Sequence, residues 1–413
     1  MYIKRTSEKL INELSKMFSV LIITGPRQVG KSTMLLLMKP KNMNYVSLDD
    51  LEQRKLAISD PKYFLEIHGT PLIIDEIQYA PNLLPYIKMK VDETKYKELI
   101  DGESSKCLYW ITGSQKFNIM KDVSESLAGR AAILELNSLS FEELNNNDFG
   151  LFKPNIENIK NKKITKHFSI KEIFEVIFKG GMPSIIANNL DKDLYFSSYV
   201  NTYNERDLKE LVNVSKTTDF YNFMQYLAVR TSQELNYSSI AKEIGVDSKT
   251  IKSWISTLET SGIIYLLHPY HRNMSNRIIK SPKVYFMDTG LCSYLAKYSS
   301  PEILEAGALS GAIFETFVVS EIIKSFYNNG MDPKRDLYFY RDKDQKEVDL
   351  LYVDGEKIYP IEIKKGISPN HPDKNFSVLK KFNLEIGHGL VICMIEKITP
   401  INKNCTLIPV EYI

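Results

Sequence analysis

The chain has 413 residues, of which 43% are hydrophobic and 25% are charged, an ordinary composition for a globular protein long enough for two or three domains. The formal net charge of +2 favours no class of partner, so a nucleic-acid surface would have to be a local patch. The four cysteines form no C-x-x-C pair, which argues against a zinc site or a disulfide framework. No apolar run approaches the roughly 18 residues that span a bilayer, so we expect a cytoplasmic protein without membrane contact.

A phosphate-binding loop stands near the amino terminus. The apolar run 20–24 predicts a buried strand, residues 25–32 fit G-x-x-x-x-G-K-[ST] at every fixed position, and residues 33–38 have helical composition. Gly25 and Gly30 let the backbone curl so that its N–H groups face an anion, to which the helix adds its positive end. The alternative, a glycine-rich turn with a chance lysine, agrees less well with the two flanking elements.

The residues of this loop have separate predicted roles. Lys31 would reach the β- and γ-phosphates of ATP, and the hydroxyl of Ser32 would hold Mg²⁺. The residues that we expect to bind the nucleotide are Gly25, Pro26, Arg27, Gln28, Val29, Gly30, Lys31, Ser32 and Thr33.

Two carboxylates follow a second apolar run. A strand over 43–48 comes first, and residues 71–76 then read PLIIDE, the pattern of a Walker B strand. Asp75 would bind Mg²⁺ together with the P-loop serine, and Glu76 would orient and deprotonate the attacking water. The alternative is a buried strand that ends in a solvated acidic turn.

Two further polar positions flank the next strands. Residues 107–112 predict a strand, after which Ser114 is the candidate sensor of the γ-phosphate, with Gln115 as the alternative. Arg130 precedes the apolar strand 131–136 and could stabilise phosphate charge in cis or from a neighbouring subunit, or form a structural ion pair. Strands that alternate with helices predict an α/β domain with a mainly parallel sheet.

The middle of the chain predicts a helix-turn-helix followed by a strand. Residues 145–166 are rich in Asn and Lys and read as a linker, whereas 237–244 and 249–258 predict two helices before a strand at 263–267. Helix, turn, helix and strand are the order of a winged helix, with Ser248 as a candidate cap. Either this module reads DNA or it is a structural or protein-contact module. The predicted DNA contacts are Lys249, Thr250 and Lys252 in the second helix, and Arg272 and Arg277 in the basic stretch that follows.

The carboxyl-terminal third predicts a helix over 311–324 and strands over 337–341, 347–352 and 357–364. Residues 362 and 364 point to one face of the last strand, where a carboxylate of the neighbouring strand can meet them. A nuclease-like site would therefore contain Asp349, Glu362 and Lys364, with Mg²⁺ on the two carboxylates and Glu315 completing the set. The alternative is an alternating strand with a solvated polar face.

These motifs together resemble a known group of proteins. The blocks that carry the resemblance are GPRQVGKST, LIIDEIQ, ITGSQ, SESLAGR and GGMP, followed by YSSIAKEIGVDSKTIKSWISTLETSGIIYLL, KSPKVYFMDTGL and GAIFETFVVSEI. The chain is similar to prokaryotic AAA-type P-loop ATPases that carry an uncharacterised C-terminal domain, and in that family this domain resembles the PD-(D/E)xK nuclease fold.

The resemblance implies roles for individual residues. Lys31, Ser32 and Asp75 would bind MgATP, with Glu76 as the catalytic carboxylate and Ser114 as the sensor. Asp349, Glu362 and Lys364 match the nuclease-like core, although Val348 stands where the motif has proline. The family has no firmly shared substrate.

The expected fold class is α/β: a P-loop NTPase (AAA-like) parallel sheet, then a winged-helix module and an α/β restriction-endonuclease-like domain. The expected boundaries are 1–145 for the ATPase domain, 146–235 for a linker and helical lid, 236–290 for the winged helix and 291–413 for the nuclease-like domain. We expect a homo-oligomeric ATPase that uses ATP and Mg²⁺ and acts on DNA as a motor or switch. The rival is a regulatory ATPase that binds protein partners, with an inactive nuclease fold.

Overall fold

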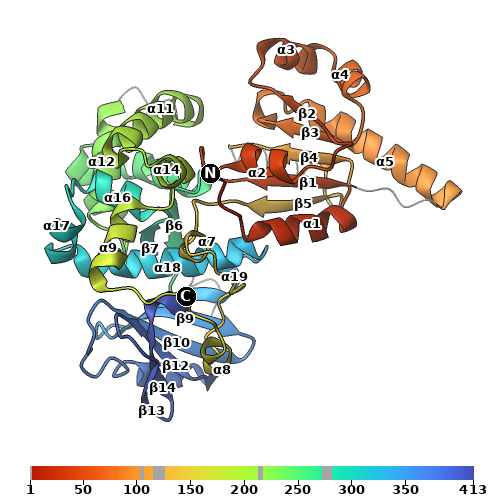
Figure 1. Cartoon of the computed structure of the whole chain (residues 1–413). Helices are drawn as coiled ribbons and strands as arrows, with labels where there is room; N and C mark the ends of the chain where they lie inside the picture. Colours follow the sequence, from red (N-terminus) through yellow and green to blue (C-terminus); the bar gives the residue numbers. More distant parts are fainter. Residues whose placement is uncertain (1, 103–106, 115–125, 213–216, 272–280) are drawn as a thin grey trace.

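The amino-terminal lobe is built on a five-stranded parallel sheet in the order β2-β3-β4-β1-β5 (Figure 1). The computed structural model describes residues 2–102, 107–114, 126–212, 217–271 and 281–413. The elements of this lobe are α1 (Ser7–Met17), β1 (Val20–Thr24), α2 (Lys31–Met38), β2 (Asn44–Ser47), α3 (Leu51–Ser59), α4 (Pro61–His68), β3 (Leu72–Asp75), η1 (Ile77–Tyr79), α5 (Leu83–Asp101), β4 (Tyr109–Thr112) and β5 (Ala131–Glu135).

All five predicted strands of this lobe are confirmed to within three residues at each end. Their apolar runs read as strands because a parallel sheet between helices is buried on both faces, and all five residues of β1 are buried. The Walker B strand β3 is not the direct neighbour of the P-loop strand β1. β4 lies between β1 and β3, so the carboxyl end of β4 also lies at the site, between the ends of the P-loop strand and the Walker B strand.

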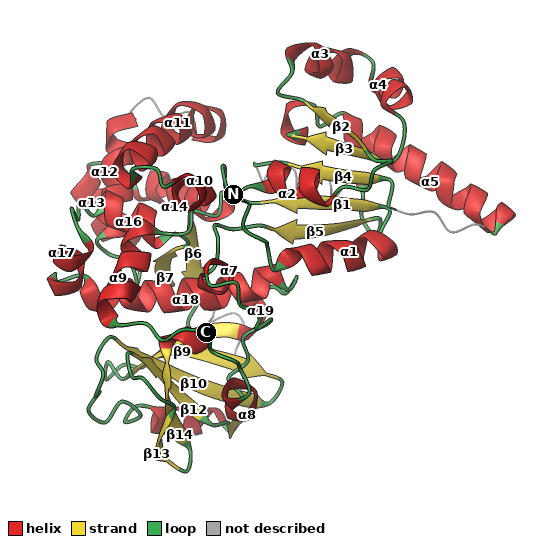
Figure 2. Ribbon diagram, in the orientation of Figure 1, coloured by secondary structure: helices red, strands yellow, loops and turns green. Residues whose placement is uncertain are grey.

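A helical lobe stands beside this sheet (Figure 2). Its elements are α7 (Phe141–Leu144), α9 (Ile170–Lys179), α10 (Pro183–Asn188), α11 (Lys192–Val212), α12 (Thr217–Ala228), α13 (Tyr237–Ile244), α14 (Ser248–Thr260), β6 (Ile264–Leu267), β7 (Lys283–Phe286), α16 (Thr289–Leu295) and α17 (Pro301–Ala306), whereas α8 (Ile156–Lys160) lies beside the carboxyl-terminal sheet. The predicted helix, turn, helix and strand are present as α13, α14 and β6. The cap of α14 is Asp247 rather than Ser248, since the Asp247 carboxylate accepts from two helix N–H groups.

The carboxyl-terminal lobe is a seven-stranded mixed sheet with α18 along it. Its elements are α18 (Ser310–Asn328), α19 (Pro333–Asp336), β8 (Leu337–Arg341), β9 (Glu347–Asp354), β10 (Lys357–Lys364), η2 (Phe376–Phe382), β11 (Glu385–Ile386), β12 (Gly389–Cys393), β13 (Thr399–Asn402), β14 (Cys405–Pro409) and η3 (Val410–Tyr412). The predicted strands 337–341 and 357–364 match β8 and β10, and β9 extends two residues beyond its predicted end. In the described part of the chain, no helix has the length and apolar character needed to cross a membrane.

The helix α18 connects the three lobes. Its Glu321 accepts from the backbone N–H of Phe141 at 2.6 Å, and its Lys324 donates to the carbonyl of Leu139 at 3.2 Å, both just beyond β5. Glu321 and Lys324 also pair with each other at 2.8 Å, and both are buried. Because a buried charge is costly unless it is paired, this arrangement fixes α18 against the segment that follows β5.

The stretch 145–166, which we predicted to be a solvated linker, is packed against the core at a few apolar positions and exposed over much of the rest. It contains α8, and Phe152 and Ile159 are buried in the main core. Lys162 donates to the carbonyl of Tyr412 at 2.8 Å. The polar composition misled the prediction because the few apolar residues of this stretch are the ones that pack.

Candidate functional site

The loop after β1 has a backbone that requires glycine at its first position. Gly25 has a φ of +133°, and a Cβ there would lie 2.0 Å from the carbonyl oxygen of Leu136. Gly30 has a φ of +91° and precedes the first residue of α2, and Gln28 is left-handed at 60°. The backbone therefore curls in front of the amino end of α2, as the predicted anion nest requires.

The Walker A hydroxyl and the Walker B carboxylate meet at the end of the sheet. Ser32 Oγ donates to Asp75 Oδ1 at 2.7 Å. Lys31 is buried, and its Nζ donates to the carbonyl oxygens of Gly25 at 3.0 Å and Pro26 at 2.7 Å. A hydroxyl and a carboxylate oxygen at one point match the ligands that Mg²⁺ prefers, so Ser32 and Asp75 fit this ion. When bound, the ion would neutralise charge on the phosphate oxygens.

Two further hydroxyls hold the Walker B carboxylate, and the sequence analysis did not single them out. Tyr45 on β2 donates to Asp75 Oδ2 at 3.0 Å, and Thr112 at the end of β4 donates to Asp75 Oδ1. Burial and the nearby Asp75 raise the pKa of Tyr45 to about 12, so the phenol remains a donor at neutral pH. The available signal for Thr112 was a hydroxyl residue at a strand end, two positions before the sensor candidate.

The candidate base occupies an uncommon backbone conformation. Glu76 follows β3 with φ 60° and ψ 49°, and its N–H donates to Thr112 Oγ1 at 3.2 Å. The side-chain amide of Gln78 donates to the carboxylate of Glu76 and, at 3.3 Å, to Ser114 Oγ. The structure thus brings the predicted base and the predicted sensor together through Gln78. Gln115, the alternative sensor, lies outside the described residues.

Arg130 lies at the far end of the sheet from the P-loop. Its carbonyl accepts from the N–H of Val20, the first residue of β1, at 3.3 Å. A strand of this length separates the arginine from the P-loop by about 16 Å. Arg130 also pairs with Asp92 on α5 through two contacts of 2.6 and 3.0 Å. A role in cis is therefore wrong, the ion pair is present, and a role toward a neighbouring subunit stays a prediction.

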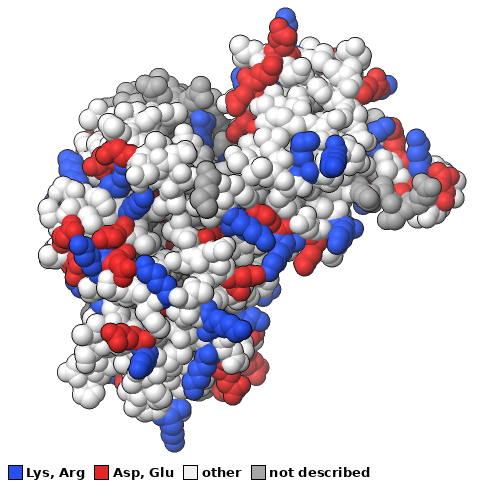
Figure 3. All heavy atoms as spheres, in the orientation of Figure 1, with Lys and Arg blue, Asp and Glu red and all other residues white. Residues whose placement is uncertain are grey.

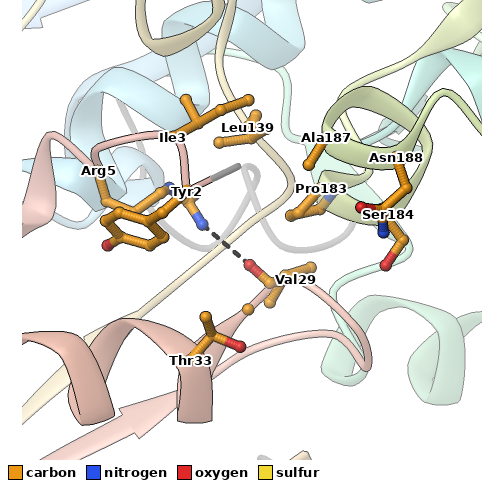
Figure 4. A pocket seen from close by; sticks show the side chains of 11 residues that line it. Tyr2, Ile3, Arg5, Val29, Thr33, Leu139, Pro183, Ser184, Ala187 and Asn188 are labelled. Atoms are coloured by element: carbon orange, nitrogen blue, oxygen red, sulfur yellow. Dashed lines mark hydrogen bonds between the residues drawn. The ribbon is translucent and has the colours of Figure 1, made fainter.

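A cavity of about 350 Å³ opens beside the P-loop (Figure 4). Its walls come from the amino terminus, the P-loop with α2, the segment after β5, and α10. The lining residues are Tyr2, Ile3, Arg5, Val29, Gly30, Thr33, Leu139, Pro183, Ser184, Ala187 and Asn188. Mostly apolar walls with a few polar groups are typical of a pocket for a flat organic group.

A buried arginine ties the amino terminus to the P-loop. Arg5 donates from Nη1 to the carbonyl of Val29 at 2.9 Å, the contact drawn in Figure 4. It also donates to the carbonyl of Asn137 at 2.8 Å and pairs with Glu143 at 3.0 Å. The sequence offered no motif for Arg5, because its partners lie in two segments distant from it in the chain, the P-loop and the stretch after β5.

The helical lobe contacts the P-loop at two points. A Cβ on Gly30 would lie 3.9 Å from Pro183 at the start of α10, and a Cβ on Gly262 would lie 2.9 Å from Pro26. The nucleotide loop is therefore enclosed between the parallel sheet and the helical lobe.

The predicted DNA-reading helix α14 presents part of its polar face to solvent. Lys249 and Lys252 are exposed, whereas Thr250 is partly buried and its hydroxyl donates to Asp247 at 2.7 Å. The hydroxyl of Thr250 is thus engaged in the helix cap, and its contact with DNA stays a prediction. Arg272 and Arg277 lie outside the described residues.

The second sheet brings the predicted carboxylates and lysine together. β9 and β10 are antiparallel, with Leu350 opposite Ile361, which places Asp349 and Glu362 side by side. Lys364 Nζ lies 2.6 Å from Glu362 and 3.3 Å from Asp349. The convergence predicted from the strand pattern is therefore present.

Glu315 is held by a different cation. Lys283 on β7 is buried, and its Nζ lies 3.0 Å from Glu315 and 2.5 Å from Glu347. The hydroxyl of Tyr285 donates to Glu315 at 2.7 Å. The sequence analysis missed Lys283, which joins the helical lobe to Glu347 at the beginning of β9.

The pair Asp349 and Glu362 offers a limited donor set for a metal ion. Oε2 of Glu362 is buried without a hydrogen-bond partner, and burial together with Asp349 raises the pKa of Glu362 to about 8. Within the described ranges, no three His, Cys, Asp or Glu residues are arranged to hold a metal. Two carboxylates fit Mg²⁺ where water or substrate phosphate supplies the other ligands.

Three consecutive stretches of the chain match known domain families. Residues 17–145 match an AAA domain, residues 170–302 match a domain of unknown function (DUF8612), and residues 310–413 match another domain of unknown function (DUF4143). The first stretch contains β1 to β5, with the P-loop, which is the Walker A motif, and the Walker B strand. Residues 17–145 are therefore similar to an AAA-type P-loop ATPase domain. The other two descriptions name no activity.

Relatives extend the likeness beyond this domain. The uncharacterized protein Rv2008c of Mycobacterium tuberculosis is 24% identical over 398 residues, which cover 95% of this chain and 80% of the relative. The uncharacterized protein MJ1544 of Methanocaldococcus jannaschii is 22% identical over 377 residues, which cover 87% of this chain and 78% of the relative. Among solved structures, the Walker-type ATPase PABY2304 of Pyrococcus abyssi aligns with a TM-score of 0.41 at 14% identity, over 70% of this chain and 94% of that one.

Proposed function

We propose that the amino-terminal domain binds and hydrolyses ATP with Mg²⁺. The observation that carries this proposal is the 2.7 Å hydrogen bond from Ser32 to Asp75, with Glu76 as the next residue. The hydroxyl of Ser32 and the carboxylate of Asp75 would supply protein ligands for the Mg²⁺ of MgATP, and the adjacent carboxylate of Glu76 would supply a base. The match of residues 17–145 to an AAA domain supports the same activity.

The other residues of the site have roles in this reaction. Lys31 and the curled loop backbone would bind the β- and γ-phosphates. The base of the nucleotide would occupy the cavity beside Val29 and Pro183, which directly adjoins the P-loop. Ser114 would sense the γ-phosphate from the end of β4. ATP would then join the sheet to the helical lobe, because both contribute walls of the cavity.

We further propose that the protein acts on DNA, because two lysines are exposed on α14 and two buried carboxylates meet a partly exposed lysine on β9 and β10. Lys249 and Lys252 of α14 would contact DNA phosphates or bases as part of a winged helix. Asp349, Glu362 and Lys364 would bind DNA or cut it, with a metal-activated water as nucleophile. Acidic and basic side chains are interspersed over the face drawn in Figure 3, so the DNA surface would be local.

The rival proposal is a regulatory ATPase whose middle and carboxyl-terminal lobes bind proteins. It is favoured by Lys283, which neutralises Glu315 and Glu347 from the neighbouring lobe. Loss of metal-dependent DNA cleavage in Asp349→Ala would support nuclease activity, whereas DNA binding without any cleavage would support an inert nuclease fold.

We also propose a homo-oligomer. Arg130 lies at the end of the sheet opposite the P-loop of its own chain, beside the first residue of β1, so it would have to reach the site of a neighbouring copy to stabilise phosphate charge.

The test is ATP hydrolysis by the purified full chain with and without DNA of several shapes, at a low and a high salt concentration. Stimulation by one form of DNA that weakens with salt would support action on DNA, because phosphate contacts release counterions. Turnover that is indifferent to every DNA would favour the protein-directed rival. No turnover under any condition would contradict the ATPase proposal itself.

A further inference from the structure

The side chain of Gln78 has one polar atom that its protein neighbours leave unused. Its Nε2 donates to the carboxylate of Glu76 and, at 3.3 Å, to Ser114 Oγ. Both amide hydrogens are thereby engaged. Its Oε1 is buried and has no hydrogen-bond partner among the residues that the structure describes. A buried acceptor without a donor costs free energy, so its presence beside a candidate base points to a ligand with a hydrogen to donate.

The backbone keeps this amide against the base. Glu76 is left-handed, a conformation that is uncommon outside glycine and recurs at functional sites. It reverses the chain at the end of β3, and the short helix η1 then carries Gln78 back over the carboxylate. Ile77 between them is buried, and the N–H of Tyr79 donates to the carbonyl of Glu76 at 3.1 Å. The position of the amide thus follows from the turn.

We propose that Gln78 is a catalytic residue that orients the attacking water together with Glu76. This inference rests on the proposed ATPase function. The water donates one hydrogen to Oε1 of Gln78 and the other to the carboxylate of Glu76. As the water oxygen bonds to the γ-phosphorus, Glu76 takes the proton, the bond from the γ-phosphorus to the bridging oxygen breaks, and ADP leaves with that electron pair.

A carboxamide suits this place because it donates and accepts at once. The donor half holds Glu76 beside Ser114, and the acceptor half fixes the second hydrogen of the water. Methionine at position 78 keeps the length and removes both functions. Glutamate keeps acceptors but loses the donor and places a second negative charge beside the base.

The experiment compares the full-length wild type with Gln78→Met, Glu76→Gln and the double variant, in single-turnover hydrolysis and in ATP binding. We expect Gln78→Met to lower the hydrolysis rate about 100-fold, the effect of removing one oriented group at an active site. The dissociation constant for ATP should change less than about two-fold. In the Glu76→Gln background, adding Gln78→Met should lower the hydrolysis rate by less than about three-fold, because the two residues act as a unit.

The matched control is Gln225→Met on α12. Gln225 also has a buried amide atom without a partner, Nε2, but it lies outside the nucleotide site. We expect this variant to hydrolyse ATP at the wild-type rate. If Gln78→Met melts at a lower temperature than the control, Gln78→Leu, which also lacks both amide functions, takes its place and should show the same loss of rate with ATP binding retained.

Three results would overturn the role of Gln78. They are a variant at position 78 that hydrolyses ATP at the wild-type rate, one that hydrolyses it faster, and one that loses binding as much as rate. If the wild type hydrolyses ATP and the variant at position 78 does so at the same rate, only this inference is rejected. A wild type that never hydrolyses ATP rejects the proposed function and this inference with it.

Discussion

Ser32 and Asp75 lie 43 positions apart in the chain and share a hydrogen bond of 2.7 Å. The bond joins the loop after β1 to the end of β3, although β4 separates these two strands in the sheet. Asp75 also accepts from Tyr45 and Thr112, so hydroxyls from three other segments converge on one carboxylate. Such convergence fixes the carboxylate before an ion arrives, and preorganisation of this kind lowers the cost of binding.

Substitutions of the two residues adjacent to this contact, Glu76 and Lys31, should affect ATP binding and hydrolysis differently. Glu76→Gln should retain ATP binding and lower hydrolysis by about 100- to 10,000-fold, because it removes the base and keeps the shape. Lys31→Ala should lose ATP binding and turnover together. Binding of a fluorescent ATP analogue and release of phosphate measure the two effects. Glu356→Gln in an exposed turn is the matched control, and an unchanged rate in Glu76→Gln would remove Glu76 from this role.

Tyr45→Phe should raise the Mg²⁺ concentration required for half-maximal turnover. The substitution removes the donor at 3.0 Å from Asp75 Oδ2, and a hydrogen bond to a charged group is worth about 1.5–3 kcal/mol, which corresponds to at least a ten-fold shift. Titration of turnover with Mg²⁺ at saturating ATP measures it. Tyr63→Phe, at an exposed position of α4, should leave the titration unchanged. Equal titrations for both variants would mean that Tyr45 does not support the ion site.

Arg130→Ala should regain activity when it is mixed with Lys31→Ala. Each variant alone should be nearly inactive if Arg130 serves a neighbouring copy. In a mixed assembly, an intact P-loop of one copy can face an intact arginine of the other. Phosphate release over a series of mixing ratios measures this recovery. A mixture no more active than its components would contradict the role in trans and leave Arg130 with only its ion pair to Asp92.

Glu142→Gln should make stability less dependent on pH. Burial is the main cause that raises the pKa of Glu142 from its ordinary value of 4.5 to about 7. A raised carboxyl pKa in the folded state favours folding below the unfolded pKa, and this contribution is lost as the pH rises through the folded value. At about pH 8 the variant should be more stable by about 2 kcal/mol. Glutamine can still accept from Gly150, which Glu142 contacts at 3.1 Å.

Thermal unfolding at about pH 5 and about pH 8 measures this difference, with the window set by the two pKa values. Glu157→Gln, at an exposed position of α8, should keep the wild-type pH dependence. If Glu142→Gln loses as much stability between about pH 5 and about pH 8 as the wild type, the raised pKa of Glu142 is not the cause of the pH dependence.

Lys283→Met should destabilise the protein by about 3 kcal/mol, because removal of one partner leaves buried charge uncompensated. Lys283 is 3% exposed and pairs with Glu315 and Glu347. Lys334→Met is the matched control, since its pair with Glu259 at 2.6 Å is solvent-exposed and worth about 0–1 kcal/mol. Urea unfolding measures both, and equal midpoints would contradict a structural role for Lys283.

The sequence by itself determined the local elements and the candidates for nucleotide chemistry. The P-loop, the Walker B strand and the strands that bear Asp349 and Glu362 were predictable because each depends on a short pattern. Apolar runs mark buried strands, glycine marks the left-handed turn, and alternation places residues 362 and 364 on one face.

Only the tertiary structure decided which of these side chains meet. The insertion of β4 between β1 and β3 brings Thr112 to Asp75, and the reversal at Glu76 brings Gln78 to Ser114. The same sheet places Arg130 at the far end from its own P-loop, and the packing of lobes sets Lys283 against Glu315. Such contacts join residues that are distant in the chain, and their partners depend on strand order and burial, which no local pattern encodes.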